Sequence, residues 1–277
     1  MNVMDSYSLE GKVAIVTGAL GLIGRQHCEA LAEAGADVVV VDLKQELCDK
    51  FADSLPKESI GVATDITDQK SVENLRDKTI EVFGRIDVLV NNAAINDMVE
   101  KPTEDKENST EEINYSMFEN YPVDLFRKVM DVNVTGMFLC SQVLGAEMAR
   151  QGSGSIINIA STYGMVAPDQ SLYVEEDGSQ TFFKSASYPT AKGAVIAFTK
   201  FLAAYWGSKG VRVNTLSPGG VENGQNEFFV KNYSKKTPLG RMAQSSDYKG
   251  GLVYLASDAS SYMTGNNLVI DGGWTAW

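Results

Sequence analysis

Histidine is almost absent from this chain of 277 residues, which contains only His27. Cysteine is scarce as well: Cys28, Cys48 and Cys140 are an odd number of widely spaced residues, mostly inside apolar helical patterns. Such a set favours reduced, buried thiols over a disulfide framework. With one histidine, a site built from histidine and cysteine has too few ligands at any workable spacing, so we expect no metal site.

Positive charge is also in short supply. The chain has 24 lysines and arginines against 36 acidic residues, a formal net charge of −12, and no basic block. That balance argues against a surface for nucleic acid or for an anionic membrane. No apolar run approaches membrane-spanning length, and residues 1–12 lack the basic and apolar regions of a secretory signal. We therefore expect a cytoplasmic protein that binds neither nucleic acid nor a membrane.

Short β-branched runs alternate with segments of helical periodicity along the chain. Near-continuous apolar runs are typical of strands buried on both faces, and their alternation with helices is typical of a parallel, doubly wound sheet. Because we find no internal repeat and no linker, we predict an α/β fold of the Rossmann type in a single domain over residues 1–277, with about seven strands and helices on both faces of the sheet. The strands are expected at 12–17, 36–42, 60–64, 86–94, 155–161, 211–217 and 267–271, and helices at about 22–34, at 71–83 and around Tyr188.

Two segments interrupt this alternation, one polar and acidic over about 97–122 and one of mixed composition over about 167–183. Both follow predicted strands, so both should emerge at the carboxyl edge of the sheet, where such folds bind ligands. For the first segment, a solvated surface loop is an equal alternative. The second lies between two candidate catalytic residues, Ser161 and Tyr188, which favours a wall or lid of the substrate pocket.

The run TGALGLIG at residues 17–24 joins the first predicted strand to the first predicted helix. In such a loop Gly18 permits a tight turn, Gly21 lets the backbone approach a pyrophosphate, and Gly24 lets the helix pack on the sheet. The N-terminus of the helix then faces the negative charge of the phosphates. This pattern predicts a dinucleotide site.

Asp42 ends the second predicted strand, 42 − 24 = 18 residues after Gly24. A carboxylate at this position can accept hydrogen bonds from the ribose hydroxyls of adenosine and would repel a 2′-phosphate, which favours NAD over NADP as the cofactor. Lys44 and Arg25 are nearby cations that oppose this preference. Asp65, after the third predicted strand, could contact the adenine amino group or serve as a turn or cap residue.

Tyr188 and Lys192 are four residues apart and so project from one face of a helix, a turn from each other. An ammonium beside a phenol favours the phenolate and lowers a pKa that starts at about 10. A tyrosine tuned in this way can give or take a proton near neutral pH, as hydride transfer to or from a carbonyl carbon requires. On its own, Tyr-x-x-x-Lys is more often an ordinary helix surface.

Nine motifs follow one another along the chain: TGALGLIG, Asp42, ATDITD, NNAA at 91–94, Asn133 in DVNVTGMF, INIAS ending at Ser161, YPTAK at 188–192, LSPGG at 216–220 and SSYMTGNNLVIDGG. In this order they resemble the motifs of the short-chain dehydrogenase/reductase family over essentially the full length. The glycine spacing is typical of the long branch of sugar-nucleotide epimerases and dehydratases, whereas the length and the C-terminal motifs match the short, single-domain branch. The long gaps from Asn91 to Asn133 and from Ser161 to Tyr188, together with the ending DGGWTAW, resemble a sub-branch near flagellin- or surface-glycan-modification oxidoreductases.

The resemblance implies a role for each of four catalytic positions. Tyr188 would be the general acid/base, and Lys192 would lower its pKa and bind the nicotinamide ribose. Ser161 would hold and polarise the substrate oxygen, and Asn133 would support a water-linked proton relay to Lys192. Beside Gly18, Gly21, Gly24, Asp42, Asp65, Tyr188 and Lys192, the implied cofactor contacts are Leu22, Ile23, Leu43, Ile66, Asn92, Ala93, Ala94, Pro218, Gly219 and Val221.

The implied function is NAD(P)(H)-dependent interconversion of a secondary alcohol and a ketone, on a sugar-like or polyhydroxylated small molecule. One alternative is a 3-oxoacyl-carrier-protein reductase, which the net charge of −12 disfavours because the carrier protein is acidic. A sugar-nucleotide dehydratase or epimerase rests on the glycine spacing alone. A non-catalytic NAD-binding protein would be expected to lose the tyrosine or the lysine, and this chain keeps both.

Oligomerisation is implied by the resemblance as well, since relatives commonly form tetramers through the helix that carries Tyr-x-x-x-Lys and the long helix before it. We expect a homotetramer or a dimer. The apolar run at 194–206 fits such an interface and fits core packing equally well. His27 lies on the first predicted helix, where a structural histidine with satisfied hydrogen bonds is favoured over a catalytic one.

Overall fold

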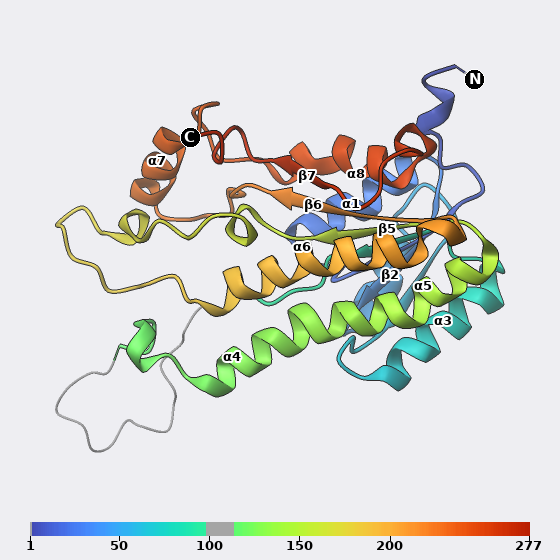
Figure 1. The fold of residues 1–277 in the computed structure, drawn as a ribbon, viewed down its shortest axis with the longest axis horizontal. Coiled ribbons are helices and arrows are strands. Elements are labelled where there is room, and N and C mark those ends of the chain that lie inside the picture. The colour runs from blue at the N-terminus through green and yellow to red at the C-terminus, as the bar shows by residue number, and fades with distance from the viewer. Residues whose placement is uncertain (1, 98–113) are drawn as a thin grey trace.

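The computed structural model describes residues 2–97 and 114–277. Most of the first predicted insertion, 97–122, therefore lies outside the described residues. Within the described part, seven parallel strands form one sheet in the order β3-β2-β1-β4-β5-β6-β7 (Figure 1). The strands are β1 (Val13–Thr17), β2 (Asp37–Asp42), β3 (Ser59–Ala63), β4 (Val88–Asn91), β5 (Gly154–Ile159), β6 (Val211–Pro218) and β7 (Asn267–Ile270).

The sheet confirms the predicted fold class. Every predicted strand is present, with ends that shift by up to three residues. The largest difference is at 86–94, where the ladder ends at Asn91 because the chain turns there toward the glycine loop. The helices are α1 (Leu22–Glu33), α2 (Gln45–Ala52), α3 (Gln69–Phe83), α4 (Val123–Met130), α5 (Met137–Gln151), α6 (Ser187–Trp206), α7 (Glu227–Lys236) and α8 (Lys249–Ala256).

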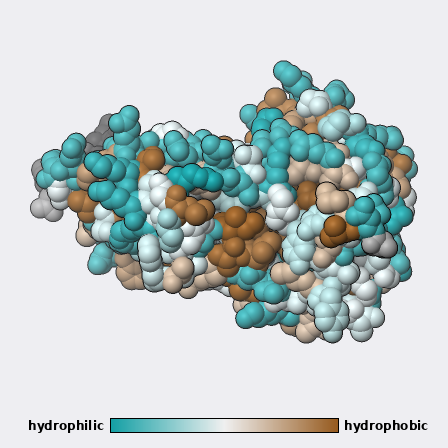
Figure 2. All heavy atoms as spheres, turned by 90° about the horizontal axis from the view of Figure 1, so that it is seen from above, coloured by the Kyte–Doolittle hydropathy of each residue, from teal (hydrophilic) through white to brown (hydrophobic). Residues whose placement is uncertain are grey.

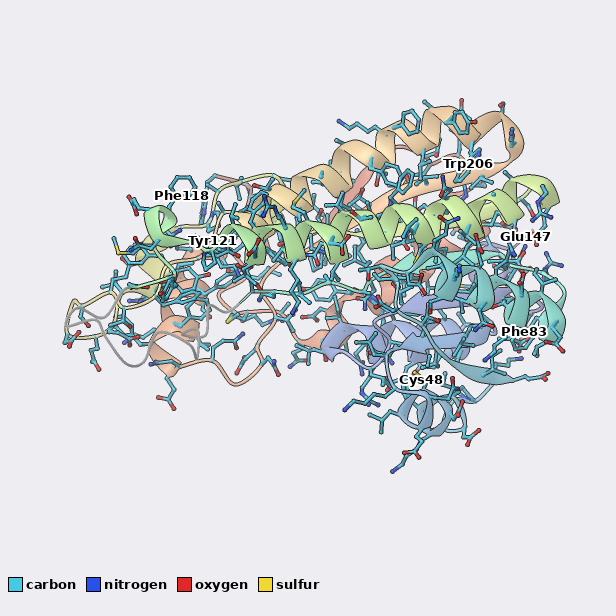
Figure 3. The ribbon with its side chains drawn as sticks, turned by 90° about the horizontal axis from the view of Figure 1, so that it is seen from below. Cys48, Phe83, Phe118, Tyr121, Glu147 and Trp206 are labelled. Carbon is cyan, nitrogen blue, oxygen red and sulfur yellow. The ribbon has the colours of Figure 1, made fainter. Side chains whose placement is uncertain are left out.

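Two hydrophobic clusters lie on opposite faces of the sheet. On one face Ala14 and Val16 of β1 pack with α1 and α8, and on the other Val13 and Ile15 pack with α3, α5 and α6. In Figure 3, α5 lies between α6 and α3 on this second face. Strand residues are thus buried on both sides, which explains why the strands are continuous apolar runs rather than alternating ones. The three cysteines are buried and free, as expected.

The strand order reverses between β1 and β4. The central residue Ile15 of β1 pairs with Val39 of β2 on one side and with Leu89 of β4 on the other. The chain crosses from β3 back over the sheet to β4, so the loops after β1 and β4 leave the sheet in opposite directions at this point. In parallel α/β folds, a crevice at the carboxyl ends of such strands is where ligands bind.

Helices α4 and α5 form one continuous helical stretch, Val123–Gln151, joined by the π-helical segment η3 (Asp131–Gly136). By length and composition this stretch could cross a membrane, although charged residues toward both ends leave it no uncharged run longer than 132–146. Half of its most apolar 18-residue window is buried inside the fold, as in a core helix of an α/β domain. The face shown in Figure 2 mixes hydrophilic and hydrophobic residues, and its largest hydrophobic patch lies near the middle.

Candidate active site

The glycine loop after β1 is held against the end of β4 by Asn92. The Asn92 side-chain amide donates hydrogen bonds to the carbonyl oxygens of Thr17 at 2.9 Å and Gly18 at 3.0 Å. Gly18 has a φ of +63°, which favours glycine. A Cβ on Gly24 would lie 2.2 Å from the Gly18 carbonyl oxygen and 2.9 Å from the Asn92 amide nitrogen. The loop therefore needs glycine at both positions to pass this close to α1 and β4.

The carboxylate of Asp42 lies at the end of β2, beside the glycine loop. One of its oxygens accepts a hydrogen bond from the Leu20 backbone at 3.0 Å, and the other accepts one from the Leu43 backbone at 2.8 Å. These bonds fix the carboxylate at the mouth of the loop. Asp65 accepts two hydrogen bonds from Thr67, so it does act as a turn residue, and it also lines the cavity described below.

Asn133 is buried within η3, the π-helical segment between α4 and α5. Its side-chain amide faces Ile95, with Oδ1 accepting from the Ile95 nitrogen at 2.8 Å and Nδ2 donating to the Ile95 oxygen at 3.0 Å. Single π turns inside α-helices are frequent at functional sites, because the extra residue turns side chains out of the regular helical positions. Here the turn ties the helix to the chain segment that follows β4.

Tyr188 and Lys192 lie in the first turns of α6, with the Lys192 ammonium 5.6 Å from the centroid of the Tyr188 ring. Lys192 is buried and donates a 2.7 Å hydrogen bond to the carbonyl oxygen of Ile159, the last residue of β5. Ser161 follows two residues later and caps the short helix η4 (Thr162–Gly164). A Cβ on Gly164 would lie 2.7 Å from the Lys192 carbonyl oxygen, so this glycine lets the Ser161 segment pack closely on α6.

Burial sets the protonation of this pair. It lowers the pKa of Lys192 to about 8 and raises the pKa of Tyr188 above its usual value. The hydrogen bond with Ser161 lowers the pKa of Tyr188, whereas the charge of Asp97 raises it further. Lys192 is not among the causes of this shift, so its expected role in lowering the pKa of Tyr188 stays a prediction. In the unliganded protein the loss of hydration dominates, and it favours the neutral phenol.

One cavity of about 1230 Å³ runs from the glycine loop to Tyr188. Every cofactor contact predicted from the sequence lines it, together with Ser161, whereas Asn133 stands behind the wall at Ile95. The segment predicted as a pocket wall, 167–183, contributes Leu172, Tyr173 and Phe182. The predicted contacts in the lining are Gly18, Gly21, Leu22, Ile23, Gly24, Asp42, Leu43, Asp65, Ile66, Asn92, Ala93, Ala94, Tyr188, Lys192, Pro218, Gly219 and Val221.

Aromatic rings line the end of the cavity away from the glycine loop. The Tyr173 ring contacts Phe182 edge-on at 5.2 Å between centroids and Phe229 of α7 at 5.4 Å. Tyr233 of α7 stacks on Trp274 at 4.2 Å, so the C-terminal segment supports this wall. Trp277 is exposed, and its indole nitrogen donates to the Lys236 carbonyl oxygen.

Sequence reasoning missed two charged residues of the site, Asp97 and Lys184. Asp97 is buried, and its Oδ2 accepts hydrogen bonds from Tyr121 and from Ser187, the latter at 2.9 Å. Tyr121 lies just before α4, near Phe118 (Figure 3). Lys184 is buried beside Tyr188. Both residues stand next to motifs that we did use, NNAA and YPTAK, and that proximity was the available signal.

The sequence predicts no metal site, and the structure bears on this only in its described residues. Within 2–97 and 114–277, no three His, Cys, Asp or Glu side chains are grouped as ligands for a metal ion. His27 is buried in α1, and neither of its ring nitrogens has a hydrogen-bond partner among the described residues. The expectation that His27 has satisfied hydrogen bonds is therefore wrong.

A family model described as enoyl-(acyl carrier protein) reductase matches residues 18–275. The NAD-dependent glycerol dehydrogenase of Listeria innocua is 31% identical, over 97% of this chain and 96% of its own. The D-threitol dehydrogenase of Mycolicibacterium smegmatis is 34% identical, over 99% of this chain and 97% of its own. The chain belongs to the short-chain dehydrogenase/reductase family. A crystal structure of a gluconate 5-dehydrogenase from Burkholderia cenocepacia in complex with NADP and tartrate is 29% identical, covers both chains fully and superposes with a TM-score of 0.83.

As a short-chain dehydrogenase/reductase, this protein is an NAD(P)-dependent oxidoreductase acting on CH–OH groups. The residues present fit the dinucleotide. The glycine loop leaves no room for side chains at Gly18 and Gly24 and lies at the N-terminus of α1, which is suited to a pyrophosphate. Asp42 lines the cavity beside this loop, and the cavity continues from there to Tyr188.

Proposed function

We propose that this protein is an NAD-dependent dehydrogenase that interconverts a secondary alcohol and a ketone on a sugar-like or polyhydroxylated small molecule. The observation that carries the proposal is the single cavity that joins the glycine loop and Asp42 to Tyr188, Lys192 and Ser161. A cofactor site and a proton donor in one cavity provide both halves of an alcohol–ketone reaction.

The proposed reaction moves two electrons and two protons from the alcohol. When bound, the nicotinamide would supply the acceptor for the carbinol hydrogen and its bonding electron pair. The hydroxyl proton goes to the phenolate oxygen of Tyr188 as the C=O double bond forms, and the reverse reaction returns both. Ser161 holds the substrate oxygen next to Tyr188, because it follows β5 by two residues and lines the same cavity as Tyr188.

Lys192 has two parts in this proposal. Its ammonium stabilises negative charge on Tyr188, and its hydrogen bond to the Ile159 oxygen keeps it directed toward the cavity. Asn133 acts at a distance: it holds Ile95, which lines the cavity, and it supports a water-linked path for the proton. These assignments extend the roles that the family resemblance implies.

NAD is the proposed cofactor, in preference to NADP. The Asp42 carboxylate is fixed beside the glycine loop by two backbone N–H groups, where it would accept hydrogen bonds from ribose hydroxyls and repel a 2′-phosphate. Arg25 forms no ion pair with this carboxylate; its guanidinium bonds to the Leu20 carbonyl oxygen and lies over the Phe51 ring.

Polyhydroxylated substrates are supported by two of the relatives, a glycerol dehydrogenase and a D-threitol dehydrogenase. A 3-oxoacyl-carrier-protein reductase is the second candidate, favoured only by the description of the family model. The net charge of −12 disfavours docking of an acidic carrier protein.

The direct test is Tyr188→Phe, which removes one hydroxyl and keeps the ring. Loss of a general acid/base lowers kcat by about 10²- to 10⁴-fold. The variant should still bind NADH, as measured by fluorescence titration, because the glycine loop and Asp42 are intact. Near-native turnover in this variant would exclude the mechanism, and a wild-type enzyme inactive on a panel of polyols, sugars and ketones with either cofactor would exclude the function.

We further propose a single catalytic domain over residues 1–277, located in the cytoplasm, and a homo-oligomer, a tetramer or dimer, formed through α5 and α6. Phe201 and Tyr205 of α6 are 61% and 59% exposed and stack on each other, and Phe138 of α5 is exposed nearby. A hydrophobic face of this kind favours association. A monomeric mass in sedimentation velocity at micromolar concentration would exclude it.

A further inference from the structure

A second lysine is buried in the catalytic cavity besides Lys192. Lys184 is 8% exposed, lines the cavity, and places its ammonium 4.9 Å from the centroid of the Tyr188 ring. It donates a hydrogen bond to the side-chain oxygen of Asn96. The Lys184 ammonium is therefore closer to the centre of the Tyr188 ring than the Lys192 ammonium, whose corresponding distance is 5.6 Å.

The position of Lys184 is fixed by the segment 167–183. The side-chain oxygen of Gln170 accepts from the Lys184 backbone nitrogen at 2.9 Å, and its amide donates to the Lys184 carbonyl oxygen at 2.9 Å. The preceding residue, Phe183, donates from its backbone to Ser116 at 3.0 Å. Both chain segments that distinguish this protein's pocket thus meet where they orient Lys184.

Lys184 forms no ion pair with a described carboxylate. Burial lowers the pKa of this lysine, and the charge of Asp97 counteracts that effect. Asp97 directs Oδ2 to Tyr121 and Ser187, and its Oδ1 is buried without a hydrogen-bond partner among the described residues. An ammonium has three N–H donors, and Asn96 accepts from one. A buried cation in this state is stabilised strongly by a hydrogen-bonded anion.

We infer that Lys184 binds a carboxylate of the substrate, so that this enzyme prefers a hydroxy acid or oxo acid to a neutral polyol. The inference rests on the proposed dehydrogenase function and names its substrate class. A carboxylate fits better than a phosphate because one monovalent cation is available there. Lys192 is bonded to the Ile159 oxygen, and Lys128, the other lysine of the lining, is exposed.

The test compares substrates that differ by the carboxylate. Initial rates at saturating NAD are measured for D-gluconate against D-sorbitol and for 4-hydroxycyclohexanecarboxylate against cyclohexanol. Wild type should show the higher kcat/KM with the acid of at least one pair. In Lys184→Met the loss for that acid should exceed the loss for its neutral partner by about 10- to 100-fold, mainly through KM, the size expected for one hydrogen bond to a charged group. Lys184→Arg should retain most of the preference.

Lys200→Met is the matched control, because Lys200 lies on the exposed side of α6 and outside the cavity lining. It should leave the ratio of acid to neutral substrate at the wild-type value. Equal losses for acid and neutral substrates in Lys184→Met would overturn the inference and assign Lys184 to the positioning of Tyr188. Higher kcat/KM for the 6-phosphate of sorbitol than for gluconate in wild type would also overturn it.

A binding measurement separates this inference from the proposed function. Calorimetric titration of the wild-type–NADH complex with gluconate or tartrate needs no turnover. If these anions bind wild type and bind Lys184→Met about 10-fold or more weakly, Lys184 is an anion site even where no alcohol is oxidised. If no carboxylate binds wild type while neutral polyols turn over, the inference fails and the dehydrogenase function stands.

Discussion

The side-chain amide of Asn133 and the backbone of Ile95 form two hydrogen bonds, of 2.8 and 3.0 Å, that join the π turn of the α4–α5 stretch to the chain leaving β4. Ile95 lines the cavity, whereas Asn133 does not. Asn133 therefore acts on the site by holding its wall. This arrangement explains how a residue outside the cavity can act together with Tyr188.

Asn133→Ala should remove both bonds and leave the Ile95 N–H and C=O groups without their partner. The expected cost is about 1–3 kcal/mol in the free energy of unfolding, from urea denaturation. The KM for the cofactor should rise, because the chain from Asn92 to Ile95 shapes the cavity. Asn133→Asp keeps the acceptor for the Ile95 nitrogen, so its free energy of unfolding should lie between those of wild type and Asn133→Ala. Wild-type stability in Asn133→Ala would contradict the role assigned to this pair.

Replacing Asp42 by Asn tests the cofactor preference through charge alone, since shape and one oxygen remain. Charges a few ångströms apart near a protein surface interact by up to about 4 kcal/mol, and partial exposure reduces that to about 1–2 kcal/mol. The ratio of kcat/KM for NADP to that for NAD should rise about 10-fold. Asp65→Asn is the matched control, because its carboxylate is already engaged by Thr67. An unchanged ratio in Asp42→Asn would remove the physical basis for preferring NAD.

The fold was predictable because its signals are local. The strands are buried on both faces, so each appears as an uninterrupted apolar run, and TGALGLIG lies at a strand–helix junction that only glycine can form. The helical stretch Val123–Gln151 was missed, because its π turn breaks the helical period at Asp131–Gly136.

Residues placed by long-range contacts were not predictable. Lys184 is held by Gln170 and, through Phe183, by Ser116, which is 68 residues before it in the chain (184 − 116). The protonation of Tyr188 depends on burial, which no four-residue spacing reveals. The placement near flagellin-modifying enzymes stays a prediction.

The raised pKa of Tyr188 predicts a marked pH dependence for alcohol oxidation. Oxidation needs the phenolate to accept the hydroxyl proton, and burial makes the phenolate scarce at neutral pH. The kcat/KM for the alcohol should therefore rise with pH through the alkaline range, whereas ketone reduction, which uses the phenol, should not. Lys192, with a pKa of about 8, loses its charge in the same range, so the rise should be less than tenfold per pH unit. A pH profile that falls between 7 and 9 for oxidation would contradict this assignment.

His27 should make the stability of this protein fall in mild acid. Burial lowers its pKa to about 4 from an ordinary value of 6.5, so between these values the unfolded chain binds a proton that the folded chain does not. Stability then decreases as pH falls from 6.5 to 4, by about 3 kcal/mol at about 1.4 kcal/mol per pKa unit. Because His27 is the only histidine, His27→Leu removes every imidazole titration. Carboxylates titrate in both proteins, so their effect cancels in the difference between the two free energies of unfolding. In urea unfolding at pH 7, 6, 5 and 4.5, the stability of the variant relative to wild type should therefore increase as pH falls. Parallel curves would mean that the imidazole takes up a proton in the folded state as readily as in the unfolded one.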